Sequence, residues 1–548
     1  MNSLSRREFL RSTGCALPAV AVLAGATPEQ SRRPPNIVLI LADDMGFSDL
    51  GCYGSEIATP NLDALAHGGI RFTRFSNFAR CCPSRAALMT GLYPHQAGVG
   101  HMWYVPSRPM PTYQGYLNRR CMTIGEALRA GGYRTLMVGK WHLAGDHRRD
   151  HPERWPSARG FDRFYGFLGG TANYFRPNLT PNGILRQFLA DDRHIDPGST
   201  DYYTTNAFSD QAVKFIQEYG REDKPFFLYA AYNAPHFPLH ALPQDIEKYR
   251  GKYLAGWDEL RMRRHHRLLE LGLFDRQLKL SPRDEQAPQW SAVKNKEHWD
   301  LKMAVYAAQV DCLDQGVGRI LAALKETGNE DNTLVMFLSD NGGTAEHQDR
   351  STGIPPGAME SFLAYDLPWA NASNTPFRRY KHWVHEGGIA TPFIARWPAV
   401  IKETDGISRF PGHVIDIMST CLDAAGIKYP KRYEGHDLLP TEGESLVPVF
   451  KGTVQPRQKA VFWEHEGNRA VSQGKWKLVS YVSKQQGDKW ELYDIEADRT
   501  ELTDVADHQP HVVTELRSLY EHWAKRCGVL TRTELETIVN PERLAPRL

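Results

Sequence analysis

Short runs of apolar residues recur along the chain, and polar residues follow most of these runs. The runs consist mainly of β-branched, leucine and aromatic side chains and lie at residues 36–41, 135–138, 224–232, 333–338 and 392–397. Strands that are buried on both faces of a parallel sheet have this pattern. Helix-like segments separate the runs, at residues 60–66, 123–129, 203–218, 303–327 and 414–425. The alternation predicts an α/β fold, with a loop-rich region at residues 143–205.

The pattern changes near residue 460. Four short strand-like segments are separated by turns, at residues 460–463, 469–472, 476–479 and 491–494, and a helix-like segment follows at 512–527. Short strands with turns between them are typical of an antiparallel sheet. We therefore expect a main domain over residues 35–455 and a smaller C-terminal α+β subdomain, an antiparallel sheet with one helix, over residues 456–548.

The first 26 residues are expected to be an export signal. Residues 5–11 match the twin-arginine pattern, an apolar run follows at residues 16–25, and Ala24-Gly25-Ala26 offers a cleavage site. The run is too short to remain as a membrane-spanning helix, although an N-terminal helix of the fold is an alternative. The sequence thus predicts export by the twin-arginine (Tat) machinery, a periplasmic or secreted location, and no stable membrane anchor.

The composition is typical of a globular protein. The 548 residues carry a net charge of +2, with 41% hydrophobic and 11% aromatic residues. The small charge gives no reason to expect a nucleic-acid partner. Eight cysteines occur without Cys-x-x-Cys spacing, so no zinc site is predicted.

Acidic and amide residues stand where two predicted strands end. Asp43 and Asp44 follow the first strand, and Asp340 and Asn341 follow the strand at residues 333–338. In open α/β sheets, ligand sites collect at the carboxyl edge. Adjacent carboxylates repel each other unless a cation joins them, so a metal site is one interpretation. A solvated surface turn is the other.

Basic residues follow two further strands. Lys140 and His142 are two apart on an extended segment, so their side chains point to the same face. His236 follows the strand at residues 224–232, in a Pro-His-Phe-Pro sequence. A solvent-exposed basic pair and a structural histidine are the alternatives.

The most distinctive stretch is residues 81–91, Cys-Cys-Pro-Ser-Arg-Ala-Ala-Leu-Met-Thr-Gly. It resembles the signature of the type I sulfatases, Cys-x-Pro-Ser-Arg followed five residues later by Thr-Gly. Proline suits the first turn of a helix, so residue 81 would lie just before a helix N-terminus, where an anion is favoured. An ordinary junction between a loop and a helix is the alternative.

The resemblance implies that Cys81 is oxidised to formylglycine (3-oxoalanine), for which the partner would be a formylglycine-generating enzyme. It also implies a fold similar to that of alkaline phosphatase: a large mixed, mostly parallel sheet flanked by helices, here followed by the small C-terminal antiparallel sheet and helix. The motifs that carry the resemblance are in the expected order and span most of residues 35–500. Residues 35–455 would then be the catalytic domain.

The same resemblance assigns calcium ligands to Asp43, Asp44, Asp340, Asn341 and the modified Cys81. Such oxygen donors suit a cation that takes six to eight oxygen ligands. No histidine or thiol is needed, so a soft metal is disfavoured. Magnesium stays open.

Five further residues receive catalytic roles from the resemblance. Lys140 and Lys381 would hold sulfate oxygens, Arg85 the oxygen of the modified side chain, and His142 would touch the hydrated aldehyde. His236 would face the leaving-group oxygen. Lys381 stands five residues before a Glu-Gly-Gly sequence, as in the family, and neighbouring arginines leave a misassignment open.

The activity implied is hydrolysis of a sulfate ester, of an aryl alcohol or a carbohydrate, to the alcohol and inorganic sulfate. The hydrated aldehyde at position 81 would be the nucleophile on a calcium ion. His236 is the predicted general acid, with Lys381 as the alternative. Two other functions are weighed against this one: a phosphonate or phosphodiester hydrolase of the same superfamily, and an inactive protein that binds sulfated glycans.

A basic cluster lies at residues 261–267 (Arg-Met-Arg-Arg-His-His-Arg), within residues 243–302, which look like a surface insertion. It is interpreted either as a solvated helix face or as a surface for a sulfated polysaccharide.

Overall fold

A computed structural model of the chain describes residues 33–102, 110–146, 150–178, 188–198, 201–351, 353–453, 456–482 and 489–539. The predicted export signal, residues 1–26, lies outside these ranges. Residues Pro34–Leu548 form one compact unit. Within the described ranges, no helix is both long and apolar enough to cross a membrane.

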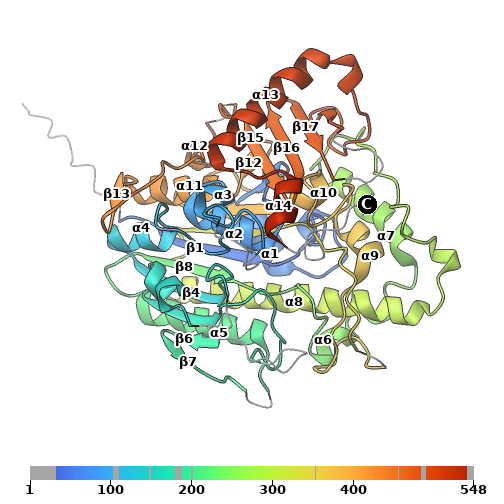
Figure 1. Cartoon of the computed structure of the whole chain (residues 1–548). Helices are drawn as coiled ribbons and strands as arrows, with labels where there is room; N and C mark the ends of the chain where they lie inside the picture. Colours follow the sequence, from blue (N-terminus) through green and yellow to red (C-terminus); the bar gives the residue numbers. More distant parts are fainter. Residues whose placement is uncertain are drawn as a thin grey trace, which may run out of the picture. The chain divides into compact units, whose positions relative to one another are not determined.

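Ten strands of the described chain form one sheet, in the order β11-β2-β10-β9-β1-β8-β4-β5-β6-β7 (Figure 1). They are β1 (Asn36–Ala42), β2 (Ile70–Phe72), β4 (Arg134–Lys140), β5 (Arg163–Phe167), β6 (Phe188–Ala190), β7 (Arg193–His194), β8 (Phe226–Ala231), β9 (Thr333–Ser339), β10 (Phe393–Arg396) and β11 (Gly406–Ser408). The central strands β9, β1, β8, β4 and β5 are parallel. Strands β10 and β6 pair antiparallel with their neighbours. The predicted large mixed sheet is confirmed.

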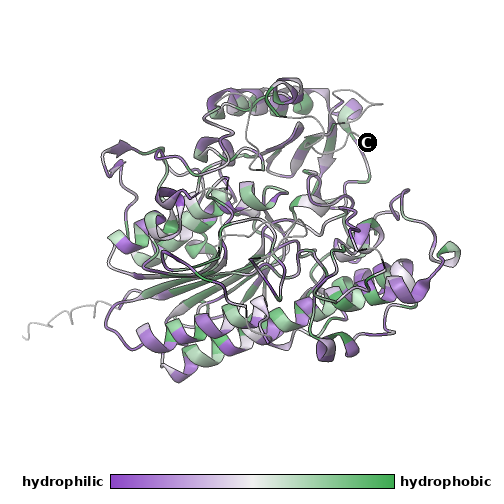
Figure 2. Cartoon of the chain, turned by 60° about the horizontal axis from the view of Figure 1, so that its bottom comes forward, coloured by the Kyte–Doolittle hydropathy of each residue, from purple (hydrophilic) through white to green (hydrophobic). Residues whose placement is uncertain are grey.

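Strand β1 shows why its sequence lacks polar alternation. Ile37, Leu39 and Leu41 belong to one hydrophobic cluster, and Val38 and Ile40 belong to another. Successive side chains of a strand point to opposite faces, so both faces of the sheet are covered. Figure 2 shows the central strands as hydrophobic, whereas the helices alternate between hydrophobic and hydrophilic residues. Burial of each such aliphatic side chain contributes about 1.5–3 kcal/mol.

Helices pack on both faces of the sheet (Figure 1). Helices α5 (Thr204–Tyr219) and α8 (Lys296–Glu326) pack together in the second cluster. Helices α2 (Cys81–Thr90), α4 (Ile124–Ala130) and α11 (Asp416–Ala425) contribute to the first. Helix α4 begins where the sequence predicts, because Thr123 and Glu126 form a capping box. The Glu126 backbone N–H donates to Thr123 Oγ1 at 3.0 Å, and the Thr123 backbone N–H donates to Glu126 Oε2 at 2.7 Å.

The described chain contains further α-helices and two small strand pairs. The helices are α1 (Pro60–His67), α3 (Pro94–Ala97), α6 (Pro243–Glu247), α7 (Gly256–Glu270), α9 (Asp366–Ser373), α10 (Glu386–Ile389), α12 (Val447–Phe450), α13 (Pro510–Cys527) and α14 (Arg532–Ile538). Two small strand pairs are β3 (Phe75–Ser76) with β12 (Gly412–His413), and β13 (Arg432–Tyr433) with β14 (His436–Asp437).

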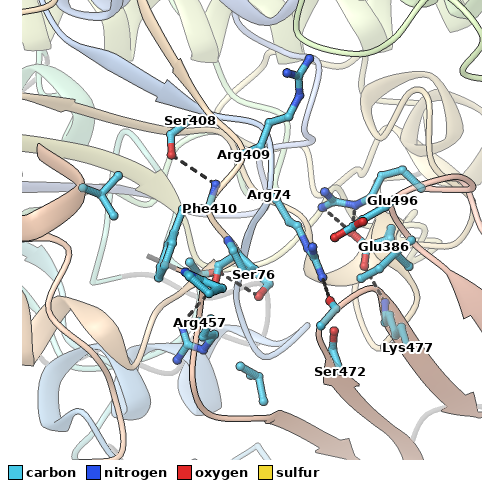
Figure 3. Close-up of a pocket in the computed structure, with 18 of the residues that line it drawn as sticks. Arg74, Ser76, Glu386, Ser408, Arg409, Phe410, Arg457, Ser472, Lys477 and Glu496 are labelled. Carbon is cyan, nitrogen blue, oxygen red and sulfur yellow. Dashed lines mark hydrogen bonds and ion pairs between the residues drawn. The ribbon is translucent and has the colours of Figure 1, made fainter. Parts of the chain in front are cut away.

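The C-terminal region contains the predicted small antiparallel sheet. Its strands are β15 (Val461–His465), β16 (Asn468–Gln473), β17 (Trp476–Ser480) and β18 (Glu491–Asp494), and α13 packs on them. Glu386 of α10 accepts hydrogen bonds from Lys477 of β17 (Figure 3) and from Arg499, each at 2.7 Å, and all three side chains are buried. A buried charged group therefore ties this sheet to the rest of the chain. The boundary at residue 455 stays a prediction.

The basic cluster at residues 261–267 lies on α7 and does not form one surface. Arg261 and Arg264 are buried, and Arg264 pairs with Asp49 at 2.6 Å. Arg263 and Arg267 are exposed and pair with glutamates of the same helix. The arrangement favours the interpretation as a partly solvated helix face.

Candidate active site

The polar residues after β1 and β9 meet at one edge of the main sheet. These strands are parallel neighbours whose last residues are aligned in register. Asp43 and Asp44 therefore lie beside Asp340 and Asn341. The Asn341 side-chain amide donates to Asp44 Oδ1 at 2.7 Å, and the Asp44 backbone N–H donates to Asp340 Oδ1 at 3.4 Å. Two strand ends that are far apart in sequence thus form one group of oxygen-bearing side chains.

This oxygen group fits a hard divalent cation. All four side chains are at most 1% exposed, and Asp43 Oδ1 and Asn341 Oδ1 have no hydrogen-bond partner among the described residues. A buried polar atom without a partner costs about 1–3 kcal/mol, and a cation would remove that cost. Carboxylate and amide oxygens are the ligands that calcium and magnesium prefer.

Three buried cations neutralise the three carboxylates. Arg85 Nε donates to Asp340 Oδ2 at 2.8 Å, Lys140 Nζ to Asp43 Oδ2 at 2.5 Å, and Lys381 Nζ lies 2.7 Å from Asp44 Oδ1. Since the charges balance, a bound divalent cation would leave this group with a net charge of +2. Such a site favours an anionic substrate.

The ionisation of the carboxylates reflects these neighbours. Burial alone would raise the pKa of Asp43, but the charges of Lys140, His236 and Arg85 lower the pKa to about 2. Burial and the negative charge of Asp43 raise the pKa of Asp340, against the pull of Arg85. A cation between the two carboxylates would favour the ionised form of both.

Residue 81 begins α2 beside these cations. The residue before it is extended, with φ −152° and ψ 143°, and Gly91 ends the helix with φ 67°, a left-handed conformation that glycine adopts readily. A hydrogen bond with Cys82 lowers the pKa of the Cys81 thiol, burial opposes this, and the charges of Lys140 and Lys381 lower the pKa further. The surroundings therefore stabilise an anion at position 81. The described cysteines are all free thiols.

Two histidines lie at the same edge. His142 is buried in a left-handed conformation (φ 59°), and neither of its ring nitrogens has a hydrogen-bond partner in the described part of the chain. Burial lowers its pKa to about 4, so the ring is neutral and can accept a proton. His236 Nδ1 lies 2.6 Å from the Phe237 carbonyl oxygen, and its Nε2 lies 3.4 Å from Lys381 Nζ and 3.5 Å from Asp44 Oδ2. His236 thus turns Nε2 toward the charged group.

The structure adds residues that the sequence reasoning missed. Glu346, in the loop after β9, accepts from Arg80 at 2.7 Å and lies 3.0 Å from His382 Nε2 and 4.0 Å from Lys381 Nζ. His465, at the end of β15, has its ring centroid 5.8 Å from that of His382. Arg80 and His382 are sequence neighbours of the predicted residues Cys81 and Lys381. This adjacency could have identified them as candidates from the sequence. Glu346 and His465 carry no such signal.

A cavity of about 430 Å³ lies elsewhere, between the main and C-terminal sheets (Figure 3). Arg74, Ser408, Arg457, Ser472 and Lys477 are among the residues that line it. None of the predicted site residues lines this cavity. The candidate site is therefore defined by its side chains and not by this opening.

The chain is similar to several known proteins. Residues 35–427 match the family described as Sulfatase, and residues 378–525 match the family described as N-sulphoglucosamine sulphohydrolase, C-terminal. An uncharacterized sulfatase of Schizosaccharomyces pombe is 34% identical over 534 residues, covering 91% of this chain and 95% of that protein. The arylsulfatase of Klebsiella aerogenes is 32% identical over 457 residues. The match covers 80% of this chain and 96% of that protein. The crystal structure of Ps i-CgsB with k-i-k-neocarrahexaose is similar to this structure, with a TM-score of 0.67 and 28% sequence identity. The match covers 90% of this chain and 93% of that chain.

Proposed function

The chain belongs to the sulfatase family and is a sulfuric ester hydrolase, and from this premise we propose that position 81 carries the nucleophile. When Cys81 is oxidised to formylglycine, its hydrated aldehyde supplies a hydroxyl group that can attack sulfur. The hydrogen bond with Cys82 and the charges of Lys140 and Lys381, which lower the pKa of the Cys81 thiol, would equally stabilise an oxyanion there. This electrostatic setting is the observation that carries the proposal.

Asp43, Asp44, Asp340 and Asn341, together with the modified residue 81, would hold a calcium ion. The oxygen atoms of Asp43 and Asn341 that lack partners support this assignment. The ion would supply positive charge next to the nucleophile and the sulfate group.

The chain's own cations and histidines account for the remaining needs of the reaction. Arg85, Lys140 and Lys381 would stabilise charge on the sulfate oxygens. His236 would donate a proton from Nε2 to the leaving oxygen, since its Nδ1 already contacts a carbonyl oxygen. His142 would accept a proton from the hydroxyl group of the modified residue 81, because burial keeps the His142 ring neutral.

The partners of the protein follow from the same chemistry. A formylglycine-generating enzyme would modify Cys81, and the Tat machinery would then export the folded chain. A carbohydrate is the substrate class that the relatives support, because Ps i-CgsB was solved with k-i-k-neocarrahexaose, and one matching family and one relative, the N-acetylgalactosamine-6-sulfatase of Rattus norvegicus, are named for sulfated amino sugars.

The test is the activity of the full chain produced together with a formylglycine-generating enzyme. We expect 4-nitrophenyl sulfate to be hydrolysed far faster than bis(4-nitrophenyl) phosphate, and mass analysis of the peptide around residue 81 to show the aldehyde. A preference for the phosphodiester would instead support the phosphodiesterase alternative. A modified chain without activity on either ester or on sulfated sugars would contradict the proposal.

A further inference from the structure

We propose that Arg80, Glu346, His382, His465 and Glu466 form a recognition cluster that binds hydroxyl groups of a sugar next to the sulfate ester. The inference rests on the proposed function and names the substrate class of the same site, a sulfated carbohydrate. The members come from segments that are far apart in sequence, and the structure brings them to one place.

The recognition cluster is continuous with the proposed catalytic residues. Arg80 directly precedes Cys81, and His382 directly follows Lys381. Glu346 links the two segments, since its carboxylate lies within 4.0 Å of the Arg80 guanidinium, the His382 ring and the Lys381 ammonium group. A ligand whose sulfate lies against Lys381 would therefore place its alcohol half against these side chains.

His465 shows that the recognition cluster needs a polar ligand. Its ring is 0% exposed, and neither nitrogen has a hydrogen-bond partner among the residues described. The nearest carboxylate oxygen, on Glu466, is 3.8 Å from Nε2, beyond hydrogen-bond distance. Buried polar groups in native proteins nearly always have a partner, so a partner from outside the chain accounts for this one. His465 is as buried as Lys140, which is proposed to contact the sulfate.

The chemistry of the recognition cluster matches hydroxyl groups. Burial, reinforced by the fixed charge of Arg80, lowers the pKa of His465, so its ring is neutral, with one donor and one acceptor. A hydroxyl group also donates and accepts, whereas an aryl ring would leave these groups without partners. His382 has a positive φ of 86°, and residues held in such sparsely populated conformations cluster at active sites and ligand sites.

A transition metal is a different ligand that the same atoms suggest. The donor atoms of His382, His465 and Glu466 lie within 4.8 Å of one another, and two imidazoles with one carboxylate can bind zinc. However, the Arg80 guanidinium contacts the ring of His382. The Glu346 carboxylate lies 3.0 Å from Nε2 of the same ring, so both ring nitrogens of His382 already have partners that a metal would have to displace, and the sugar is the better assignment.

The test compares two variants, His465→Leu and His465→Asn. Leucine and asparagine have nearly the same shape, but only asparagine can form hydrogen bonds. Activity is measured on 4-nitrophenyl sulfate and on galactose 6-sulfate, N-acetylgalactosamine 6-sulfate and N-acetylglucosamine 6-sulfate. We expect His465→Leu to lower kcat/KM on the best sugar substrate about tenfold and to change kcat/KM on the aryl sulfate less than about threefold. His465→Asn should recover part of the loss. Thermal unfolding of His465→Leu should show an unchanged or higher Tm, because no internal hydrogen bond is lost.

Other outcomes would overturn the assignment. Equal losses on both substrate types, or a lowered Tm in both variants, would assign His465 a structural role. Stoichiometric zinc that disappears in His465→Leu would assign a metal site. A wild-type enzyme that hydrolyses the aryl sulfate but none of the sugars would contradict the recognition cluster while leaving the proposed function intact. Inactivity of the wild type on every ester would instead refute the proposed function.

Discussion

Arg85 Nε lies 2.8 Å from Asp340 Oδ2, and both side chains are fully buried. The same guanidinium donates to the Lys140 carbonyl oxygen at 2.9 Å and lies 3.6 Å from Asp43. One side chain of α2 therefore connects the ends of β9, β4 and β1. Because Arg85 is four residues from position 81, the helix that positions the proposed nucleophile is fixed to the proposed metal ligands by this contact.

Replacing Arg85 with alanine should destabilise the fold as well as abolish activity. The substitution leaves Asp340 buried without its partner, and loss of one member of a buried ion pair costs about 3–5 kcal/mol. Urea unfolding of the purified protein measures this cost. The exposed Arg263→Ala, which removes a pair within α7, is the matched control and should change the unfolding free energy by less than about 0.5 kcal/mol. Equal effects of the two substitutions would refute the assigned role of Arg85.

Replacing Cys81 with serine should limit the enzyme to at most one turnover. A serine hydroxyl could attack the sulfate group, but it lacks the second hydroxyl that a hydrated aldehyde has for release of the product. We expect no steady-state hydrolysis of 4-nitrophenyl sulfate, and a serine that gains one sulfo group by intact-mass analysis. Continued multiple turnover by this variant would show that the second hydroxyl is not required.

Removal of divalent cations should lower both activity and Tm. A ligand that binds the folded state stabilises it by RT ln(1 + [L]/Kd), so calcium added to the depleted wild type should raise Tm as its concentration increases. Asp340→Asn keeps the shape of the side chain but removes a charge that faces the proposed ion. This variant should need more calcium for the same increase in Tm. Full activity of the depleted wild type would argue against a catalytic cation.

The sequence predicts the main sheet and the edge at which the charged residues meet, because continuous apolar runs mark β1, β8 and β9 and polar residues follow them directly. It does not predict β5 to β7. Strand β5 carries Arg163 and Gly166 in a short apolar segment, and β7 is only two residues long and exposed, so neither has the pattern of a buried strand. Residues 143–205 therefore look like a loop region in sequence.

The recognition cluster was missed for a different reason. His465 ends an antiparallel strand hundreds of residues after Cys81, and its approach to the site depends on how the C-terminal sheet packs. That packing rests on contacts such as the one between Glu386, Lys477 and Arg499. Pairing across such sequence distances leaves no local pattern, whereas the ligands after β1 and β9 are brought together by strand pairing that the sequence indicates.

The contact between Glu386 and the C-terminal sheet should make stability depend on pH in acid. Burial alone would raise the pKa of Glu386, but the charges of Arg499 and Lys477 lower the pKa from 4.5 to about 2. A carboxylate with a lowered folded-state pKa stabilises the protein above its unfolded pKa. That contribution, about 3 kcal/mol, is lost as pH falls from about 4.5 to about 2.

The measurement is the unfolding free energy in urea at a series of pH values across this range. Glu386→Gln should be less stable than the wild type at neutral pH, since two buried cations lose their partner, and the difference should shrink as the solution is made more acidic. The exposed Glu360→Gln serves as the control and should follow the wild-type curve. If the difference between Glu386→Gln and the wild type stayed constant down to pH 2, the carboxylate charge would not be what joins the two sheets.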